Sequence, residues 1–558
     1  MRALVLSERL DERRRALLDT LVRDVAEAYA ARPGDPLPDP RDFDAVLVDG
    51  PPLAWGPGLP AALAATVEAG ASLVVIGWAP APGEEAWAEL LGAAGDGALP
   101  DGEVFARVAG STSPLGERLP REFAVVDRFV PLLPLRSATI VLEVRVGLRD
   151  RAAALEMTRG RGRVLVSGLG RDDRALGAPA LVQLIRRALR PLGTSGAGGR
   201  NLGVGIVGYG ALGGMGYHHG LATGATPGLE LVAVVDPDLD RRKAAQTDFP
   251  GIRAYASVDE LAKDDDVELA FVATPPVHHV ALTLTLLQAG KHVACEKPLC
   301  LTLAEADRLI VAAVAARRIL TVHQNRRWDP DFVAVRRAVD GGLLGELFSV
   351  ETFVGGFAHP CRTWHSEMSV SGGAVYDWGA HHVDWILQLL GGPPRLVQAH
   401  GHKRVWHDVT NLDQVRVGFR WSDGREAEFV HSDVAAVRRP KFYIQGTAGT
   451  LVAHYRPLVF ERIEPGRGYV GERAHYAEAP AELTLARYES GYGVTETRLP
   501  PAPEQPFAFH RNLADHLHLD EPLAVTAQSV REVVAVLEAA ERSGARGGAP
   551  VTLDLGGG

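Results

Sequence analysis

The sequence predicts an α/β protein of three parts. Up to residue 323, short apolar runs alternate with helical stretches, which is typical of parallel sheets covered by helices. From residue 324 onward, strand-like runs recur between turn residues and favour a mostly antiparallel sheet with some helices. The segment GTSGAGGR at residues 193–200 is typical of a flexible linker. Because 558 residues are too many for one core, we expect domains at 1–192, 201–323 and 324–558.

The first part is expected to be a separate α/β domain. Its expected elements are strands at 2–6, 43–49, 73–77 and 162–168, a β-rich stretch at 100–160, and helices at 11–31, 59–68 and 179–189. With the segments FDAVLVDG, VEAGASLVVIG and GRGRVLVSGLGRDD, this order resembles the ThuA-like branch of the class I glutamine-amidotransferase-like fold, a flavodoxin-like α/β domain. No cysteine precedes Cys295, and Arg171 stands where the ThuA-like pattern has a histidine. We therefore expect a non-catalytic domain.

A glycine motif opens the second part. The apolar run Val204–Val207 reads as a buried strand, and a G-x-G-x-x-G pattern follows it directly. A helical stretch and a second apolar run then lead to Asp236. This strand, glycine turn, helix, strand and acid predict a Rossmann doubly wound parallel sheet that binds a dinucleotide. The motif comprises Gly208, Tyr209, Gly210, Ala211, Leu212 and Gly213.

The remaining elements of this part should place polar residues along one edge of the sheet. The expected strands are 252–255, 270–273, 292–294 and 320–322, and the expected helices are 241–247, 258–261, 276–288 and 304–317. Ligands gather at the carboxyl ends of parallel strands. We therefore expect the segments at Gly208, Asp236, Thr274, Glu296 and His323 to meet there.

Two segments carry residues suited to proton transfer. Lys297 follows a strand end, where it would touch a substrate hydroxyl; the plainer alternative is a surface lysine at a turn. If residues 371–384 are helical, Asp377 and His381 form an i, i+4 pair on one face. A carboxylate beside an imidazole suits a general base, and the alternative is a packed histidine with a solvated acid.

Composition restricts the partners. A net charge of −10 argues against a general nucleic-acid surface. No apolar run is long enough to span a bilayer, no signal peptide is visible, and three scattered cysteines fit a reducing compartment, so we expect a cytoplasmic protein. The histidine pairs are adjacent in sequence, which is a poor arrangement for chelation, and we expect no metal site.

Several further motifs follow in order. They are GYGALG, Thr274–Pro275 with His279, GKHVACEKPL, HQNRRWDPDF, GG-x-x-x-D-x-G-x-H-x-x-D, YIQGTAGTL and VREVVAVLEAAERSG. Together they resemble the Gfo/Idh/MocA oxidoreductase family over residues 201–555. The resemblance implies a Rossmann domain followed by an α+β domain with a large open sheet that often mediates homo-oligomerisation, as a dimer or tetramer. It also implies NAD(P)-linked oxidation or reduction of a sugar, inositol or related polyol.

The resemblance assigns roles to named residues. It implies Lys297, Asp377 and His381 as the catalytic residues. To the glycine loop and Asp236 it adds Thr274, Pro275, His279, Glu296 and Asn325 as cofactor-binding residues. Sequence proximity to these motifs suggests that Arg327, Trp364 and Tyr376, with Lys297 and His381, bind the substrate.

The predicted function is therefore an NAD-dependent dehydrogenase acting on a carbohydrate-like substrate. We expect His381 to remove the hydroxyl proton, Asp377 to orient its ring, and Lys297 to stabilise the developing negative charge. Asp236 disfavours a 2′-phosphate, although Arg241 and Arg242 could still accommodate NADP. The alternatives are an NAD-dependent, redox-neutral glycoside hydrolase and a non-catalytic NAD- or sugar-sensing regulator.

Overall fold

The chain forms two compact units, residues 1–199 with 515–521, and residues 200–514 with 522–558. The computed structural model describes the chain except residues 23–26, 110–112, 114, 117–118, 136–137, 191–200, 211–213, 457–461, 465–467, 471–479, 520, 554 and 556–558. The predicted linker at 193–200 lies outside the described residues. No helix in the described part of the chain has both the length and the apolar character that crossing a membrane requires.

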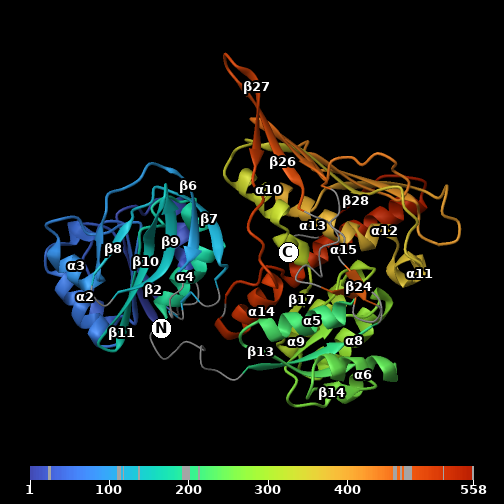
Figure 1. Ribbon diagram of the computed structural model, residues 1–558, viewed down its shortest axis with the longest axis horizontal. Helices are drawn as coiled ribbons and strands as arrows, with labels where there is room; N and C mark the ends of the chain where they lie inside the picture. The colour runs from blue at the N-terminus through green and yellow to red at the C-terminus, as the bar shows by residue number, and fades with distance from the viewer. Residues whose placement is uncertain are drawn as a thin grey trace. The chain divides into compact units, whose positions relative to one another are not determined.

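The N-terminal unit is built on one mixed sheet (Figure 1). Its parallel half has the order β2 (Glu27–Ala31), β1 (Arg2–Ser7), β3 (Ala45–Asp49), β4 (Ser72–Ile76) and β11 (Gly162–Ser167). Its antiparallel half continues with β10 (Arg149–Arg159), β9 (Thr139–Val146), β6 (Gly102–Val108) and β7 (Glu122–Asp127), and the short strands β5 (Ala93–Gly95) and β8 (Leu132–Pro134) pair beside it.

Helices cover both faces of this sheet. They are α1 (Glu12–Leu21), α2 (Leu59–Glu68), α3 (Glu85–Leu91) and α4 (Pro179–Leu189). Along β1, Ala3 and Val5 belong to the core with α1 and α4, whereas Leu4 and Leu6 belong to the core with α2 and α3. This alternation explains why the strands are apolar on both sides.

One expected element of this unit is wrong. The helix predicted for residues 11–31 ends at Leu21, and Glu27–Ala31 pairs with β1 as a parallel edge strand. The sequence EAYAA has good helix formers, but its backbone completes the sheet edge while three of its five side chains remain exposed. Tertiary pairing has overridden the local preference here.

The second unit begins with the predicted parallel sheet. Its order is β14 (Arg253–Tyr255), β13 (Leu229–Val235), β12 (Leu202–Val207), β15 (Leu269–Val272), β16 (His292–Cys295) and β17 (Leu320–Val322), and all pairs are parallel. The connecting helices are α5 (Met215–Ala225), α6 (Leu239–Asp248), α7 (Val258–Ala262), α8 (Pro276–Gln288) and α9 (Leu303–Ala316). The doubly wound fold is confirmed, and its carboxyl edge carries the expected residues.

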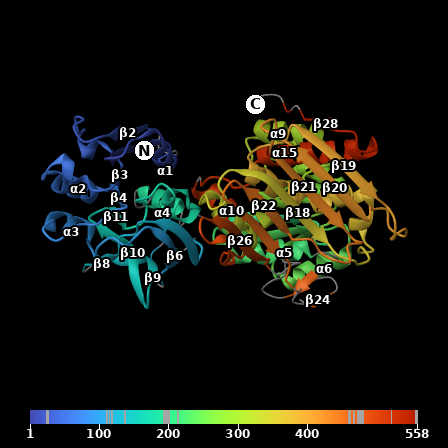
Figure 2. The ribbon, with the colours of Figure 1, turned by 90° about the horizontal axis from the view of Figure 1, so that it is seen from above.

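A large, mostly antiparallel sheet follows, as predicted (Figure 2). Its order is β27 (Gly493–Leu499), β26 (Glu482–Glu489), β23 (Gly449–His454), β22 (Phe442–Gly446), β18 (Leu347–Gly355), β21 (Glu426–Ser432), β20 (Gln414–Arg420), β19 (Leu396–His402) and β28 (Val551–Thr552). Only the β18–β21 pair is parallel among these pairs.

Helices α10 (Pro330–Asp340), α13 (Gly379–Leu390) and α15 (Ala527–Ala545) pack against strands of this sheet. Further helices of this part of the chain are α11 (Met368–Ser371), α12 (Ala374–Asp377) and α14 (Ala508–Leu519). Helix α15 packs against β19 on one side and against α9 and β17 on the other. The core formed there joins the two sheets of this unit and fixes the segments that bear the candidate site.

Candidate active site

The glycine loop lies at the end of β12 and has the backbone that the motif predicts. Gly208 has φ +93°, and a Cβ there would lie 2.8 Å from the Ala273 carbonyl oxygen. Gly210 has φ +69°, and a Cβ added there would meet no atom of the described residues within 4 Å, so the described part of the loop is open on this side. Asp236 accepts hydrogen bonds from the Tyr209 and Gly210 amides at 3.1 and 3.0 Å.

A glycine just beyond the motif packs closely against the loop. Ala211, Leu212 and Gly213 lie outside the described residues. Gly216, in the first turn of α5, packs so closely that a Cβ would lie 2.6 Å from the Tyr209 Cα. The cluster of Gly213, Gly214 and Gly216 in the sequence is consistent with close packing here, but Gly216 lies outside the G-x-G-x-x-G spacing.

The loop fits a dinucleotide. Helix α5 begins at Met215, and Gly214 at its N-cap has no side chain to cap it, so the first amides of the helix remain available to an anion. The buried Thr274 hydroxyl has no hydrogen-bond partner in the described part of the chain. An open glycine face, an uncapped helix and an unsatisfied hydroxyl at one sheet edge are what a bound pyrophosphate and nicotinamide nucleotide would complete.

Lys297 and Asp377 meet directly. Lys297 Nζ lies 2.7 Å from Asp377 Oδ1 and 3.0 Å from the Asp377 carbonyl oxygen. Both side chains are partly exposed, at 21% and 25%. Burial opposes ionisation of Asp377, but the charge and hydrogen bond of Lys297, with further contributions from His365 and His431, together lower the pKa of Asp377. Asp377 therefore holds Lys297 Nζ in a fixed position as a hydrogen-bond donor.

His381 is held by a residue that sequence reasoning missed. Its Nδ1 lies 3.2 Å from Gln324 Oε1, while Gln324 Nε2 donates to the Ala380 carbonyl at 3.0 Å. The second bond fixes the orientation of the Gln324 side-chain amide, so that its oxygen faces His381. His381 Nδ1 must therefore carry the proton, and His381 Nε2 carries the lone pair. Burial, with the charges of Lys297 and Arg326, holds the pKa of His381 well below its usual range. His381 is thus a neutral imidazole suited to accept a proton.

The expected Asp377–His381 pair is not formed. The segment 371–384 is not one helix: α12 ends at Asp377 and α13 begins at Gly379. The break between Asp377 and His381 is only Trp378, which keeps helical backbone angles (φ −84°, ψ −36°), but the Asp377 carboxylate binds Lys297 while His381 faces Gln324. Asp377 therefore orients the lysine rather than the imidazole.

Two residues predicted to bind substrate have their polar groups paired with other residues of the protein. Arg327 forms a bidentate ion pair with Asp384, at 2.8 and 2.6 Å, and also donates to Ser529. Tyr376 is buried, and its hydroxyl donates to the Leu301 carbonyl at 2.6 Å. Both predictions were based on closeness in sequence, which does not reveal where a side chain points. Trp364, by contrast, is half-buried and stacks on His365 with ring centroids 3.6 Å apart.

His279 and Pro275 belong to the framework of the edge. Pro275 caps α8. The buried His279 ring lies 2.7 Å from the Thr274 carbonyl oxygen and 2.8 Å from that of Pro298, whose bond to Lys297 is cis. His279 therefore links the strand ends that carry Thr274 and Lys297, and its role is positioning.

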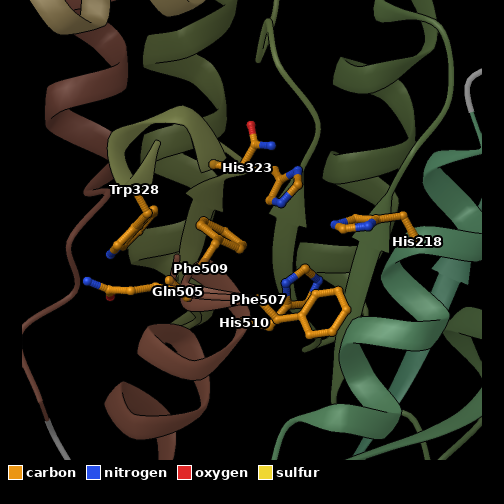
Figure 3. Close-up of a pocket in the computed structure, with 9 residues that line it drawn as sticks. His218, His323, Trp328, Gln505, Phe507, Phe509 and His510 are labelled. Atoms are coloured by element: carbon orange, nitrogen blue, oxygen red, sulfur yellow. The ribbon is translucent and has the colours of Figure 1, made fainter. Parts of the chain in front are cut away.

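Glu296 lies within a group of histidines. Its Oε1 lies 3.0 Å from His219 Nε2 and 2.8 Å from His323 Nδ1. Asn325 lies nearby and lines a small cavity beside the same group (Figure 3). The sequence prediction of a cofactor contact for these two residues overlooked this cluster, because its members come from separate segments.

Buried histidines make stability depend on pH. Burial, followed by nearby positive charges, holds the pKa of His382 well below 6.5. An unfolded chain would protonate this histidine below pH 6.5 whereas the folded protein would not, so stability falls as the pH falls below 6.5. Each such group contributes as much as about 1.4 kcal/mol per pH unit.

We expect His382→Phe to reduce the loss of Tm between pH 7.5 and pH 5.5, because the ring packs between Trp385 and Phe429. Thermal denaturation at the two pH values measures the difference. The exposed His407→Phe variant is the control and should retain the wild-type dependence. An unchanged pH dependence in His382→Phe would contradict this assignment.

Comparisons with known proteins agree with the geometry. Family models described as "Oxidoreductase family, NAD-binding Rossmann fold" and "GFO/IDH/MocA C-terminal domain" match residues 202–324 and 332–452. The 1,5-anhydro-D-fructose reductase of Ensifer adhaerens is 30% identical over 40% of this chain and 68% of its own. The scyllo-inositol 2-dehydrogenase (NADP(+)) IolW of Bacillus subtilis (strain 168) is 25% identical over 61% and 93%. An NAD-binding protein from Listeria innocua has a TM-score of 0.54 and 26% identity, covering 63% of this chain and 97% of its own.

Proposed function

Since this chain belongs to the GFO/IDH/MocA oxidoreductase family, we propose that it is a dehydrogenase acting on a secondary hydroxyl of a sugar, inositol or related polyol. The observation that carries the proposal is the arrangement of Lys297, Asp377 and the neutral His381 beside an open glycine loop. Lys297 Nζ and Asp377 Oδ1 are 2.7 Å apart. The names of two relatives, an inositol dehydrogenase and an anhydrofructose reductase, support this substrate class.

The residues divide the chemistry between them. A bound nicotinamide nucleotide supplies hydride acceptance or donation. His381 Nε2 takes the proton of the substrate hydroxyl, and Gln324 keeps the lone pair on that nitrogen. Lys297 donates a hydrogen bond to the same oxygen and stabilises its negative charge. Asp377 holds the ammonium group of Lys297 in place. This role replaces the expected one, in which Asp377 would orient the His381 ring.

NAD is the proposed cofactor. The Asp236 carboxylate follows β13 and would accept from ribose hydroxyls, whereas it would repel a 2′-phosphate. Arg242 donates to the Asp236 and Pro237 carbonyls at 2.6 and 3.0 Å, which engages its guanidinium with the backbone. The NADP(+) in the name of one relative makes this the point to test.

Asp236→Ser should shift the preference for NAD over NADP by at least about tenfold, because the repulsive charge is removed while a hydrogen-bonding group remains. Dissociation constants of both nucleotides, measured by calorimetry, give the ratio. Asp240→Ser, whose carboxylate side chain is 87% exposed, is the matched control. An unchanged ratio in Asp236→Ser would show that this carboxylate does not select the cofactor.

The remaining parts have proposed roles as well. The N-terminal unit would be a non-catalytic, ThuA-like domain, supported by the lack of a cysteine before Cys295. The large sheet would form a homo-oligomer interface, supported by Tyr488, Tyr492 and Val494, which are 77%, 83% and 69% exposed on the β26–β27 hairpin. The three cysteines are free thiols, in keeping with a cytoplasmic location.

The experiment for the dehydrogenase is a scan of NADH and NADPH formation with inositols, sugars and 1,5-anhydro sugars, together with the reverse reaction on the matching ketones. Nucleotide oxidation or reduction with one substrate class supports the proposal. Release of an aglycone from glycosides without net nucleotide reduction would replace it with a redox-neutral hydrolase. Tight nucleotide binding without any turnover would replace it with a sensor.

A further inference from the structure

Three histidines from distant segments meet in the interior of the second unit. They are His219 in α5, His323 after β17 and His510 in α14, and their side chains are 1%, 2% and 0% exposed. One nitrogen from each lies within 4.8 Å of the others. Imidazoles are costly to bury without partners, so a group of three in one place requires an explanation.

Glu296 determines which nitrogens of His219 and His323 carry the lone pairs that could bind a metal ion. Its Oε1 lies within hydrogen-bond distance of His219 Nε2, at 3.0 Å, and of His323 Nδ1, at 2.8 Å. An ionised carboxylate accepts from both, so the lone pairs lie on His219 Nδ1 and His323 Nε2. A carboxylate on the far nitrogen of a metal-binding histidine is the usual outer-shell arrangement of zinc sites.

The third histidine faces the first. His510 Nε2 lies 3.0 Å from His219 Nδ1, and His510 Nδ1 is buried without a hydrogen-bond partner in the described part of the chain. Phe271 stacks on both rings, with centroids 4.5 Å from His219 and 4.9 Å from His510, and so holds their planes. Nitrogens bound to one tetrahedral zinc ion are about 3.3 Å apart. The histidine nitrogens here are up to 4.8 Å apart, so the widest of these distances would shorten by roughly 1 Å or more when an ion binds.

A small cavity adjoins the cluster. It has a volume of about 20 Å³ and is lined by His218, His323 and His510, with aromatic side chains beside them (Figure 3). This volume is large enough to hold a water molecule. Three nitrogens and one water complete a tetrahedral zinc sphere. The aromatic residues that line it are Trp328, Phe507 and Phe509.

We propose that His219, His323 and His510 bind one divalent transition-metal ion, zinc by preference, with Glu296 as the outer-shell carboxylate and a water in the cavity as the fourth ligand. This goes against the expectation from sequence that no metal is bound, which considered only adjacent histidines. The ion would tie α5, α14 and the ends of β16 and β17 together, next to the turn that presents Lys297. The proposal does not depend on the substrate or on turnover.

The test uses the full chain without an affinity tag, stripped with a chelator. Titration with Co²⁺ should give one equivalent of binding with the visible absorption of a four-coordinate ion, and Zn²⁺ should displace it. Zinc should also raise Tm, by about 5 °C at saturating concentration. The exposed His278→Ala variant is the control and should behave as the wild type does.

His510→Phe should lose the absorption and the Tm shift, and Glu296→Gln should weaken Co²⁺ binding at least about tenfold, as removal of an outer-shell carboxylate does. Glu296→Gln nearly preserves the volume of the side chain, so it remains informative if His510→Phe fails to fold. Absence of saturable Co²⁺ binding in the stripped wild type would overturn the proposal and leave a hydrogen-bonded histidine chain. Unchanged Co²⁺ binding in Glu296→Gln would overturn the assigned carboxylate.

Discussion

Lys297→Ala should lower kcat for hydroxyl oxidation by about 10³-fold, which is the loss expected when one donor to a developing oxyanion is removed. Lys297 Nζ is the donor, and its bond of 2.7 Å to Asp377 shows that the ammonium group is held in position. Steady-state kinetics on the best substrate from the scan measure the effect. KM should change much less than kcat, because the interaction strengthens as charge develops on the oxygen.

Lys263→Ala is the matched control, because that lysine is exposed at the end of α7, away from the carboxyl edge. It should retain the wild-type kcat. A Lys297→Ala variant that folds normally and retains more than about a tenth of the wild-type kcat would remove Lys297 from the chemistry, since a hydrogen bond to the transition state contributes far more.

His381→Ala should lower kcat by about 10²–10⁴-fold, the usual contribution of a positioned general base. Its pKa is held well below 6.5 by burial and by the charges of Lys297 and Arg326, so the wild-type rate should stay level between pH 7.5 and pH 6.5. In the variant, hydroxide must take the proton instead. Its rate should therefore rise about tenfold per pH unit over the same range.

His382→Phe serves as the control for this variant. His382 adjoins His381 in α13 but packs against Trp385 and Phe429, with ring centroids 4.8 and 4.9 Å away. Its kcat should stay within about twofold of the wild type, as for a change that touches no reacting atom. A flat pH profile in His381→Ala would contradict the base assignment, because it would show that another group still accepts the proton.

Most of the nucleotide-binding part could be predicted from sequence because its signals are local. Buried strands are continuous apolar runs, and α8 begins at Pro276 and ends at Gln288, as predicted, since Pro276 and Gly290 mark its limits. The edge strand at Glu27–Ala31 could not be predicted in this way, because only its pairing with β1 distinguishes it from a helix.

The site itself was only partly predictable. The sequence predicted Lys297, Asp377 and His381 as members of one site, but the Lys297–Asp377 contact joins positions 80 apart in the chain, and no spacing rule reaches that far. Gln324 lay within a motif already noted, yet its role depends on the Ala380 carbonyl that fixes its amide. Arg327 was predicted to bind substrate, and only the fold reveals that its guanidinium pairs with Asp384.

Hydride transfer from a deuterium-labelled substrate tests the central claim most directly. The best polyol from the scan, deuterated at the reacting carbon, is incubated with NAD, and the nucleotide product is weighed by mass spectrometry. The account predicts that the wild type forms reduced nucleotide carrying one deuterium atom. It predicts that Lys297→Ala and His381→Ala form almost none of this labelled nucleotide. Reduced nucleotide without deuterium would contradict it. So would equal amounts of deuterated nucleotide formed by the two variants and the wild type.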